Sequence, residues 1–284
     1  MIESTRGRCI YVTVFRNRFI NFLRTLVLDE MLDPQKLFRD LVRIEVSRQF
    51  PTQSRGRPRL LSFDEAYDGM LRVLRTGMQW RQLTSPVVSH ITVFKTMHRW
   101  MDASVFRTAY RRLLTLYHRR RQPRHYSIDS SFVKNVYGHD CTGRNPTDRG
   151  RRATKLSVLV DDLGIPVSFV ASPGNISDMR LFHPVFDAAM VPLRRGAEVF
   201  ADKGYDSRAN RDECLRRGFR DRLFRRRTTN GRRTHAKRGV VERYFAWHDK
   251  FRRLLVRYEH KVGVYESFTL FASGVILERR MARG

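Results

Sequence analysis

Cysteine is scarce in this chain. Three cysteines occur among 284 residues, and they lie far apart, at Cys9, Cys141 and Cys214. No Cys-x-x-Cys pair is present, so the sequence supports neither a zinc ribbon nor a disulfide framework. This usage is typical of a protein that works in a reducing compartment.

Long apolar runs are missing from the N-terminal region as well. Residues 9–15 (CIYVTVF) form a short apolar run that ends at Arg16. A spanning helix needs roughly 18 or more apolar residues, and no clear small-residue cleavage site follows the run. We therefore expect a soluble, intracellular protein without a membrane partner.

Acidic residues are outnumbered two to one by basic residues. Fifty-six Lys and Arg face 28 Asp and Glu, which gives a net charge of +28. Such a field attracts polyanions, above all nucleic acid, and arginine suits bidentate phosphate contacts. A basic structural protein that binds RNA has the same composition, so charge alone leaves both classes open. The apolar content of 41% excludes wholesale disorder.

The first part of the chain has a helical pattern. Residues 1–55 are mixed and mostly helical in character, and the polar stretch 51–59 that follows indicates a linker. Ser62 and Glu65 form a capping-box pattern, and apolar residues at helical spacing run from there to Gly77. The sequence therefore predicts a capped helix over this stretch.

Two more helices are predicted downstream, with Ser89 and Ser104 as their N-caps. Three short, arginine-rich helices in succession favour a helix-turn-helix-like module that contacts DNA. A helical bundle that only packs is the alternative interpretation.

After residue 124 the pattern becomes that of an α/β domain. The predicted elements are strands at 125–133, within 155–172 (two strands around a turn at Asp161–Pro166), at 197–207 and at 218–224, helices at 178–190, 207–217 and 239–258, and a basic loop at 225–238. This order predicts a mixed sheet with helices on its faces. It is also the order of the ribonuclease-H-like fold.

Three acids stand at positions that suit metal chemistry. Asp129 interrupts an apolar strand pattern, and Asp202 ends the strand VFAD. Burying such a carboxylate is costly unless a cation or a donor meets it, and two paired strands would bring both together. Glu242 lies just past the edge of the apolar face of the helix predicted at 239–258. Three converging carboxylates can hold two divalent ions for phosphoryl transfer.

The residues alone leave other interpretations open. Asp129 can be a hydrogen-bonded strand residue, and Glu242 can be a solvated helix residue paired with Arg238.

Segments around these acids resemble the DDE transposases of bacterial-type insertion sequences, especially the group related to insertion sequence family five. The resemblance covers residues 57–272 and is carried by TGMQWRQL (76–83), VFKTMHRWMDASVF (93–106), YSIDSSFVKN (126–135), TKLSVLVDDLGIPVSFVASPGNISD (154–178), VFADKGYDS (199–207) and RGVVERYFAWHDKFRRLLVRYE (238–259). It implies that Asp129, Asp202 and Glu242 are the catalytic residues and metal ligands. The implied cofactor is a pair of Mg²⁺ ions, with Mn²⁺ as a substitute.

The resemblance also suggests which basic residues contact DNA. The family's signature around the glutamate has a Tyr, an Arg and a Lys, and this chain has His235, Arg238 and Asp249 at those positions, with Lys250 next. Arg238 and Lys250 are the candidates for the terminal phosphates, with His235 and Lys203 as further DNA-binding candidates. The departures at 235 and 249 leave the third carboxylate in place.

The sequence thus predicts three regions: a mostly helical N-terminal extension (1–56), a helical DNA-binding region (57–120) and a ribonuclease-H-like catalytic domain (121–284). The expected function is cut-and-paste transposition, in which the ends of an insertion element are cleaved and joined to target DNA. The expected partners are double-stranded DNA, as terminal inverted repeats and as target, and a second copy in a homodimer on DNA. The expected location in the cell is the cytoplasm or nucleoid of a bacterial-type host. Alternatives are a catalytically inactive, transposase-derived DNA-binding protein and another ribonuclease-H-like nuclease.

Overall fold

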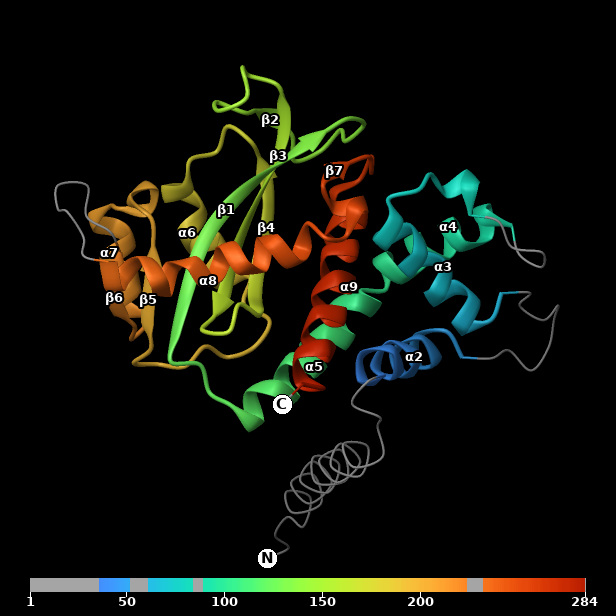
Figure 1. Cartoon of the computed structure of the whole chain (residues 1–284), viewed down its shortest axis with the longest axis horizontal. Coiled ribbons are helices and arrows are strands. Elements are labelled where there is room, and N and C mark those ends of the chain that lie inside the picture. Colours follow the sequence, from blue (N-terminus) through green and yellow to red (C-terminus); the bar gives the residue numbers. More distant parts are fainter. Residues whose placement is uncertain (1–35, 52–60, 84–88, 224–231, 284) are drawn as a thin grey trace, which may run out of the picture.

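The computed structural model describes residues 36–51, 61–83, 89–223 and 232–283, and the side chains of 232–238 are outside that description. The sequence predictions for residues 1–35 and for most of the linker at 51–59 therefore lie outside the described residues. The described part has a sheet with a helical region beside it (Figure 1).

The helical region comes first in the chain. Its elements are α2 (Leu37–Gln49), α3 (Phe63–Thr76), η1 (Trp80–Gln82), α4 (His90–Asp102) and α5 (Val105–Arg120). The predicted capping box of α3 is confirmed, since Glu65 N donates to Ser62 Oγ and the Glu65 carboxylate accepts from Ser62 N. Gly77 ends the helix in the left-handed conformation, with φ of 71°, where a Cβ would be strained.

The two further N-cap predictions have different outcomes. Ser89 caps α4 and accepts a hydrogen bond from Ile91 N. Ser104 was predicted to cap α5 in the same way, and this is wrong. Its backbone is left-handed, with φ of 53°, and its side chain makes no cap hydrogen bond. The chain turns sharply here because α4 and α5 are joined by only two residues, Ala103 and Ser104.

A seven-stranded mixed sheet follows. Its strands are β1 (His125–Asn135), β2 (Gly143–Arg144), β3 (Arg152–Asp161), β4 (Pro166–Pro173), β5 (Glu198–Ala201), β6 (Arg220–Leu223) and β7 (Val256–Arg257), interleaved with α6 (Asp178–Asp187), η2 (Lys203–Tyr205) and α7 (Arg208–Arg216). β3 pairs antiparallel with β1 and β4, whereas β5 lies parallel to β1 and β6. The predicted strands and the hairpin turn are confirmed, with shifted ends.

The chain after β6 differs from the prediction. α8 spans Arg232–His248, so residues 232–238 are helical where a loop was expected, and the helix ends ten residues before the predicted end at 258. It is followed by η3 (Arg252–Leu254) and β7, which pairs with the end of β1. Pairing with the sheet and a buried ion pair between Arg253 and Glu259 override the helical periodicity of this segment.

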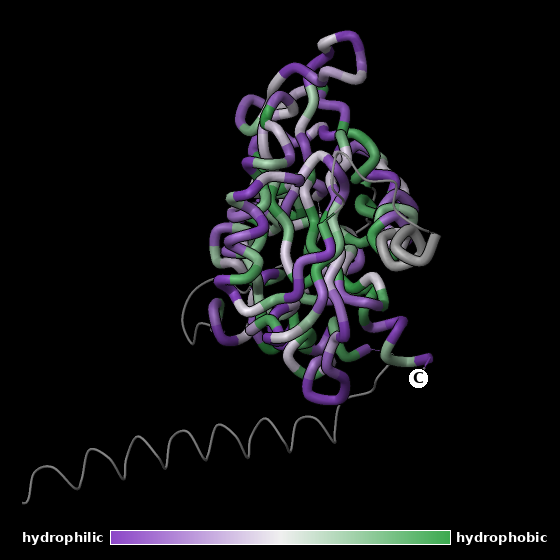
Figure 2. Tube along the Cα trace, turned by 90° about the vertical axis from the view of Figure 1, so that its left-hand side faces the viewer, coloured by the Kyte–Doolittle hydropathy of each residue, from purple (hydrophilic) through white to green (hydrophobic). Residues whose placement is uncertain are grey.

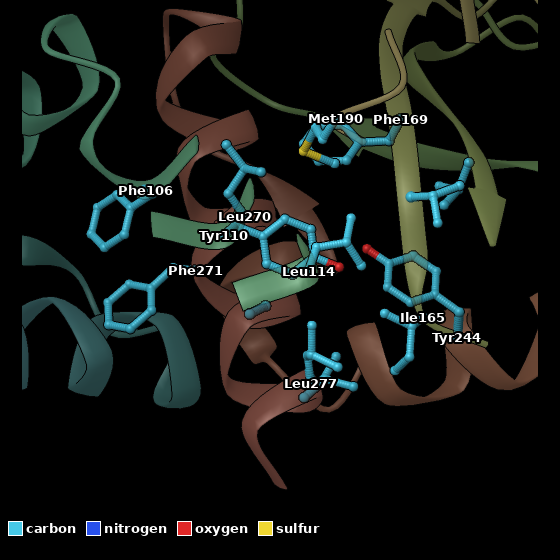
Figure 3. Close-up of a cluster of buried hydrophobic side chains, with 14 of the residues drawn as sticks. Phe106, Tyr110, Leu114, Ile165, Phe169, Met190, Tyr244, Leu270, Phe271 and Leu277 are labelled. Atoms are coloured by element: carbon cyan, nitrogen blue, oxygen red, sulfur yellow. The ribbon is translucent and has the colours of Figure 1, made fainter. Parts of the chain in front are cut away.

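α9 (Val262–Met281) was not predicted, and it organises the core. It is apolar nearly all round, so it shows no amphipathic stripe, as expected of a fully buried helix. α9 packs on α5, α8, α2 and β4. Figure 3 shows where these elements meet: Phe271 lies beside Phe106 of α5, and Tyr244 of α8 lies beside Ile165. This cluster joins the helical region to the sheet.

Hydropathy follows the layers. Figure 2 shows apolar segments inside the molecule and hydrophilic segments along the outer turns and end loops. Within the described residues, no helix has the length and apolar character to cross a membrane.

One contact between α2 and α9 gives a pH-dependent prediction. Glu278 accepts a hydrogen bond from Phe38 N at 2.7 Å, and burial raises the pKa of its carboxyl to about 7. Because the pKa of Glu278 is higher in the folded protein than in the unfolded chain, the protonated carboxyl stabilises the fold. This contribution to the free energy of unfolding is complete below about pH 4.5 and is lost as the pH rises through 7. The free energy of unfolding of the wild type, relative to Glu278→Gln, is expected to fall by up to about 3 kcal/mol from pH 4.5 to pH 8.

Urea denaturation of both proteins across this pH range measures the difference. Glu65→Gln serves as a control with the opposite sign, because hydrogen bonds from Ser62 lower the pKa of Glu65. If the free energies of unfolding of the wild type and Glu278→Gln differ by the same amount at all pH values, the raised pKa of Glu278 is contradicted.

Candidate active site

Strand pairing brings the two aspartates together. β1 and β5 run parallel, with Ile128 opposite Ala201. Asp129 is the next residue of β1, and Asp202 is the first residue after β5. Neighbouring strands lie about 4.8 Å apart, and alternate residues share a face. Asp129 and Asp202 are therefore neighbours on one face of the sheet.

Both aspartates are half-buried and are held by the backbone that follows them. Asp129 Oδ1 accepts from Ser130 N at 2.8 Å, and Asp202 Oδ1 accepts from Lys203 N at 2.7 Å. The second of these bonds caps η2, the short turn that follows β5. Each carboxylate therefore has one oxygen oriented by the chain itself.

A buried tyrosine connects the segment after β5 to β1 through Ser130, the residue after Asp129. The Tyr205 hydroxyl, at the end of η2, shares a hydrogen bond of 2.8 Å with Ser130 Oγ. Ser130 Oγ also lies 2.7 Å from Ser157 Oγ on β3. Burial, followed by the charges of Asp178 and Asp129, raises the pKa of Tyr205 well above its ordinary value. The phenol therefore stays neutral and fixes the turn after Asp202 to the strand that carries Asp129.

A buried lysine supports the same turn. Lys155 of β3 is 5% exposed, and its Nζ donates to Ile176 O at 2.7 Å and to Asp178 Oδ1 at 2.9 Å. A Cβ on Gly204 would lie 3.2 Å from Asp178 Oδ2, so the turn after Asp202 packs closely on this ion pair. Lys155 is a supporting residue beyond those predicted from the sequence, and the signal for it is a lysine within the apolar pattern KLSVLV.

Glu242 comes from α8, which packs on β1, β3 and β5 and crosses the sheet in Figure 1. Val241 and Tyr244 are fully buried, whereas Glu242 is exposed. Glu242 therefore belongs to the part of the helix that is not packed against the sheet, and its catalytic role stays a prediction. α8 covers the face that carries Asp129, because α6 and the Phe219 ring pack on the opposite face, that of Tyr126.

A glycine lets α8 lie close to the sheet. Gly164, in the turn between β3 and β4, has φ of 85°, and a Cβ there would meet Val240 O at 3.2 Å and the Trp247 ring at 3.4 Å. Both contacts flank Glu242 along the helix. The turn thus sets the position of the helix that carries the third acid.

The structure separates the four predicted DNA-binding residues into two groups. Lys203 directly follows Asp202 and is exposed, and Lys250 is exposed but lies beyond the end of α8, so it does not share a helical face with Glu242. Arg238 and His235 belong to the first half of α8, and their side chains lie outside the described residues.

Comparison with known proteins identifies this arrangement. The transposase DDE domain family matches residues 120–272, just over half of the chain. A putative transposase for insertion sequence element IS402, from Burkholderia cepacia, is 36% identical over 152 residues, which cover 51% of this chain and 70% of that protein. The chain belongs to the DDE transposases of insertion-sequence type.

One solved structure shares the fold of this transposase. The piggyBac transposase, in a synaptic complex with hairpin DNA, has a TM-score of 0.51 at 10% identity, over 88% of this chain and 75% of that one. The Mos1 strand transfer complex gives a TM-score of 0.33 at 13% identity, over 81% and 78% of the two chains. The first alignment confirms the predicted ribonuclease-H-like mixed sheet with flanking helices. Family membership makes this transposase an enzyme of DNA cleavage and strand transfer.

DDE transposases use divalent metal ions, and the two aspartates of this transposase fit such an ion. They supply carboxylate oxygens from adjacent strands on one face, and Mg²⁺ takes one or two carboxylates together with water and phosphate oxygens. Among the described residues, no three His, Cys, Asp or Glu side chains gather closely enough to hold one ion. In that part of the chain, Glu242 is therefore not gathered with the pair Asp129 and Asp202 into a three-ligand group.

Replacing Lys155 with methionine tests the support of this pair. Lys155→Met keeps roughly the length of the side chain but leaves Asp178 without its buried cation. We expect a loss of about 1–3 kcal/mol in the free energy of unfolding. DNA cleavage is expected to fall further than stability explains, because the turn after Asp202 loosens. Lys36→Met, at an exposed position, is the matched control. Wild-type cleavage by a fully folded Lys155→Met protein contradicts this role.

Proposed function

We propose that this transposase cleaves DNA at the ends of an insertion element and joins the freed 3′ ends to target DNA, with Asp129, Asp202 and Glu242 as its catalytic residues. The observation that carries the proposal is the parallel pairing of β1 with β5, which sets Asp129 beside Asp202. The packing of α8 on the same face supports the third role. The likeness of this chain to insertion sequence family five remains part of the proposal.

Asp129, Asp202 and Glu242 would together hold two Mg²⁺ ions, with Mn²⁺ as a substitute. Two such ions activate an attacking oxygen and stabilise the leaving oxygen in an in-line displacement. The protein's part is to orient the carboxylates: Ser130 N and Lys203 N each fix one carboxylate oxygen, and the bond of Tyr205 to Ser130 keeps the two strands in register. Glu242, exposed on α8, would supply the third carboxylate.

DNA contact in this proposal comes from two places. Residues 57–120 form the DNA-binding region, ahead of a catalytic domain at 121–284 and after the extension at 1–56. Arg238, Lys250, Lys203 and His235 contact the phosphates beside the cleaved bond. Both ends of the element must be held at once, so a homodimer on DNA is the expected assembly. The net charge of +28 supports a large phosphate interface.

The test is cleavage of defined DNA. The purified protein is incubated with Mg²⁺ and duplexes that carry the inverted repeats bounding its own coding sequence. We expect nicks at the element boundary, followed by joined products with a target duplex. Cleavage without joining favours a nuclease, and tight binding of the repeats without cleavage in either Mg²⁺ or Mn²⁺ favours an inactive DNA-binding derivative.

A further inference from the structure

A groove lies between the helical region and the end of the sheet that carries β7. Its volume is about 870 Å³. One side comes from η1 and α4, and the other from the segment after β1 and the segment around β7. The large side chains that line it are Trp80, Ile91, Phe94, Tyr137, Tyr258 and His260. None of these residues takes part in the site described above.

Exposed apolar side chains concentrate on this groove. In the described part of the chain, seven large hydrophobic residues are exposed, and four of them line the groove. Tyr137 is 56% exposed, Ile91 50%, Tyr258 40% and Phe94 38%. A contiguous exposed patch of this kind marks an interaction surface.

The charge of the groove is positive. Arg81, Lys261 and Arg253 line it, and the acid among its lining residues is Glu259. Glu259 is 5% exposed, and its Oε1 lies 2.6 Å from Arg253 Nε, so its charge is already compensated. The groove therefore favours an anionic partner over an uncharged, apolar one.

The aromatic wall is held rigidly. Arg257 is fully buried and donates to the carbonyls of Glu259, Asp140 and His260, and it also pairs with the Asp140 carboxylate. These bonds tie β7 to the segment after β1. On that framework the Tyr137 ring stacks on His260, with centroids 6.1 Å apart and planes 18° from parallel.

The groove is continuous with the strand of the first aspartate. Tyr137 follows directly after β1, whose residue Asn135 pairs with Arg257 of β7. Asn135 lies six positions beyond Asp129, which is about 20 Å along a strand. The groove therefore begins past the end of the strand that carries the first aspartate.

We propose that this groove binds unpaired DNA bases, on the strand that leads away from the bond to be cleaved. The proposal rests on the proposed function. Tyr137 and Tyr258 present exposed rings on which bases stack, and Arg81 and Lys261 meet the phosphates, the combination that binds single strands without sequence preference. An apolar protein segment would use the apolar surface but leave the surplus of cations unpaired, whereas single-stranded DNA fits both.

Fluorescence of a single-stranded oligonucleotide containing 2-aminopurine tests the groove. The full-length protein is titrated into the oligonucleotide in EDTA, so that no cleavage occurs. Stacking on a tyrosine quenches the fluorescence, and Tyr137→Ala and Tyr258→Ala are each expected to weaken binding by about 5- to 150-fold. Tyr137→Phe is expected to restore binding, because stacking needs the ring and not the hydroxyl. Leu215→Ala, at an exposed position of α7, is the matched control.

Each outcome decides the question. Unchanged affinity and quenching in the two alanine variants overturn the proposal, as does a Tyr137→Phe protein that behaves like Tyr137→Ala. A change in oligomeric state on sedimentation, with unchanged DNA affinity, also overturns it and assigns the groove to a protein partner. Cleavage of duplex ends is measured in parallel. Quenching without any cleavage by the wild type removes the proposed function alone, whereas normal cleavage without quenching removes the groove alone.

Discussion

Asp129→Asn and Asp202→Asn are each expected to lower DNA cleavage by roughly 10³-fold or more while leaving DNA affinity within a few-fold of the wild type. Asparagine keeps the shape and the hydrogen bond from the following backbone N–H but removes the charge that a divalent cation needs. Metal ions supply several kcal/mol of transition-state stabilisation, and each 1.36 kcal/mol is tenfold in rate. Single-turnover cleavage of a labelled repeat duplex, together with anisotropy for binding, separates the two effects.

Asp212→Asn is the control for these variants. Asp212 lies exposed on α7, where it pairs only loosely with Arg208 at 3.8 Å. Its substitution is expected to leave cleavage unchanged. Cleavage by Asp129→Asn or Asp202→Asn above a tenth of the wild-type rate contradicts the catalytic assignment. A parallel loss of DNA affinity shows instead that the residue acts in binding or folding.

DNA affinity is expected to fall about 10³- to 10⁵-fold between 50 and 200 mM salt, if 6–10 phosphates are contacted. The reason is that each neutralised phosphate releases condensed counterions, and a chain with 56 basic and 28 acidic residues has a large surplus of cations to engage. Anisotropy titrations of a labelled duplex at several salt concentrations give the slope directly. Circular dichroism at the same concentrations confirms that the protein stays folded. An affinity that changes less than tenfold contradicts a phosphate-dominated interface.

The strands that carry the two aspartates could be predicted from sequence, because their signals are local. Asp129 lies within an alternating apolar pattern, and the run VFAD ends at the polar loop that begins with Lys203. The order of the predicted elements is that of the ribonuclease-H-like fold, and pairing of these two strands would bring the first and second acid together. The pairing of β1 with β5 confirms that step.

Other parts of the site could not be predicted, because they depend on contacts between distant residues. The segment after His248 continues a helical apolar pattern, yet its pairing with β1 and the buried Arg253–Glu259 ion pair end the helix. α9 is apolar on all sides, so periodicity gave no signal. Lys155 acts on the turn after Asp202 through Asp178, which it binds and against which Gly204 packs. Lys155 and Asp202 are 47 positions apart in the sequence, and no local pattern indicates this connection.

The central claim is that three acids, on two strands and one helix, share divalent ions at the DNA. A crystal of this transposase with a repeat duplex and Mn²⁺, measured at the manganese absorption edge, tests it most directly. The account predicts anomalous peaks ligated by the carboxylates of Asp129 and Asp202, with Glu242 on one of the ions and a DNA phosphate between them. Manganese bound elsewhere, or a Glu242 carboxylate that stays turned to solvent while DNA occupies the site, contradicts it.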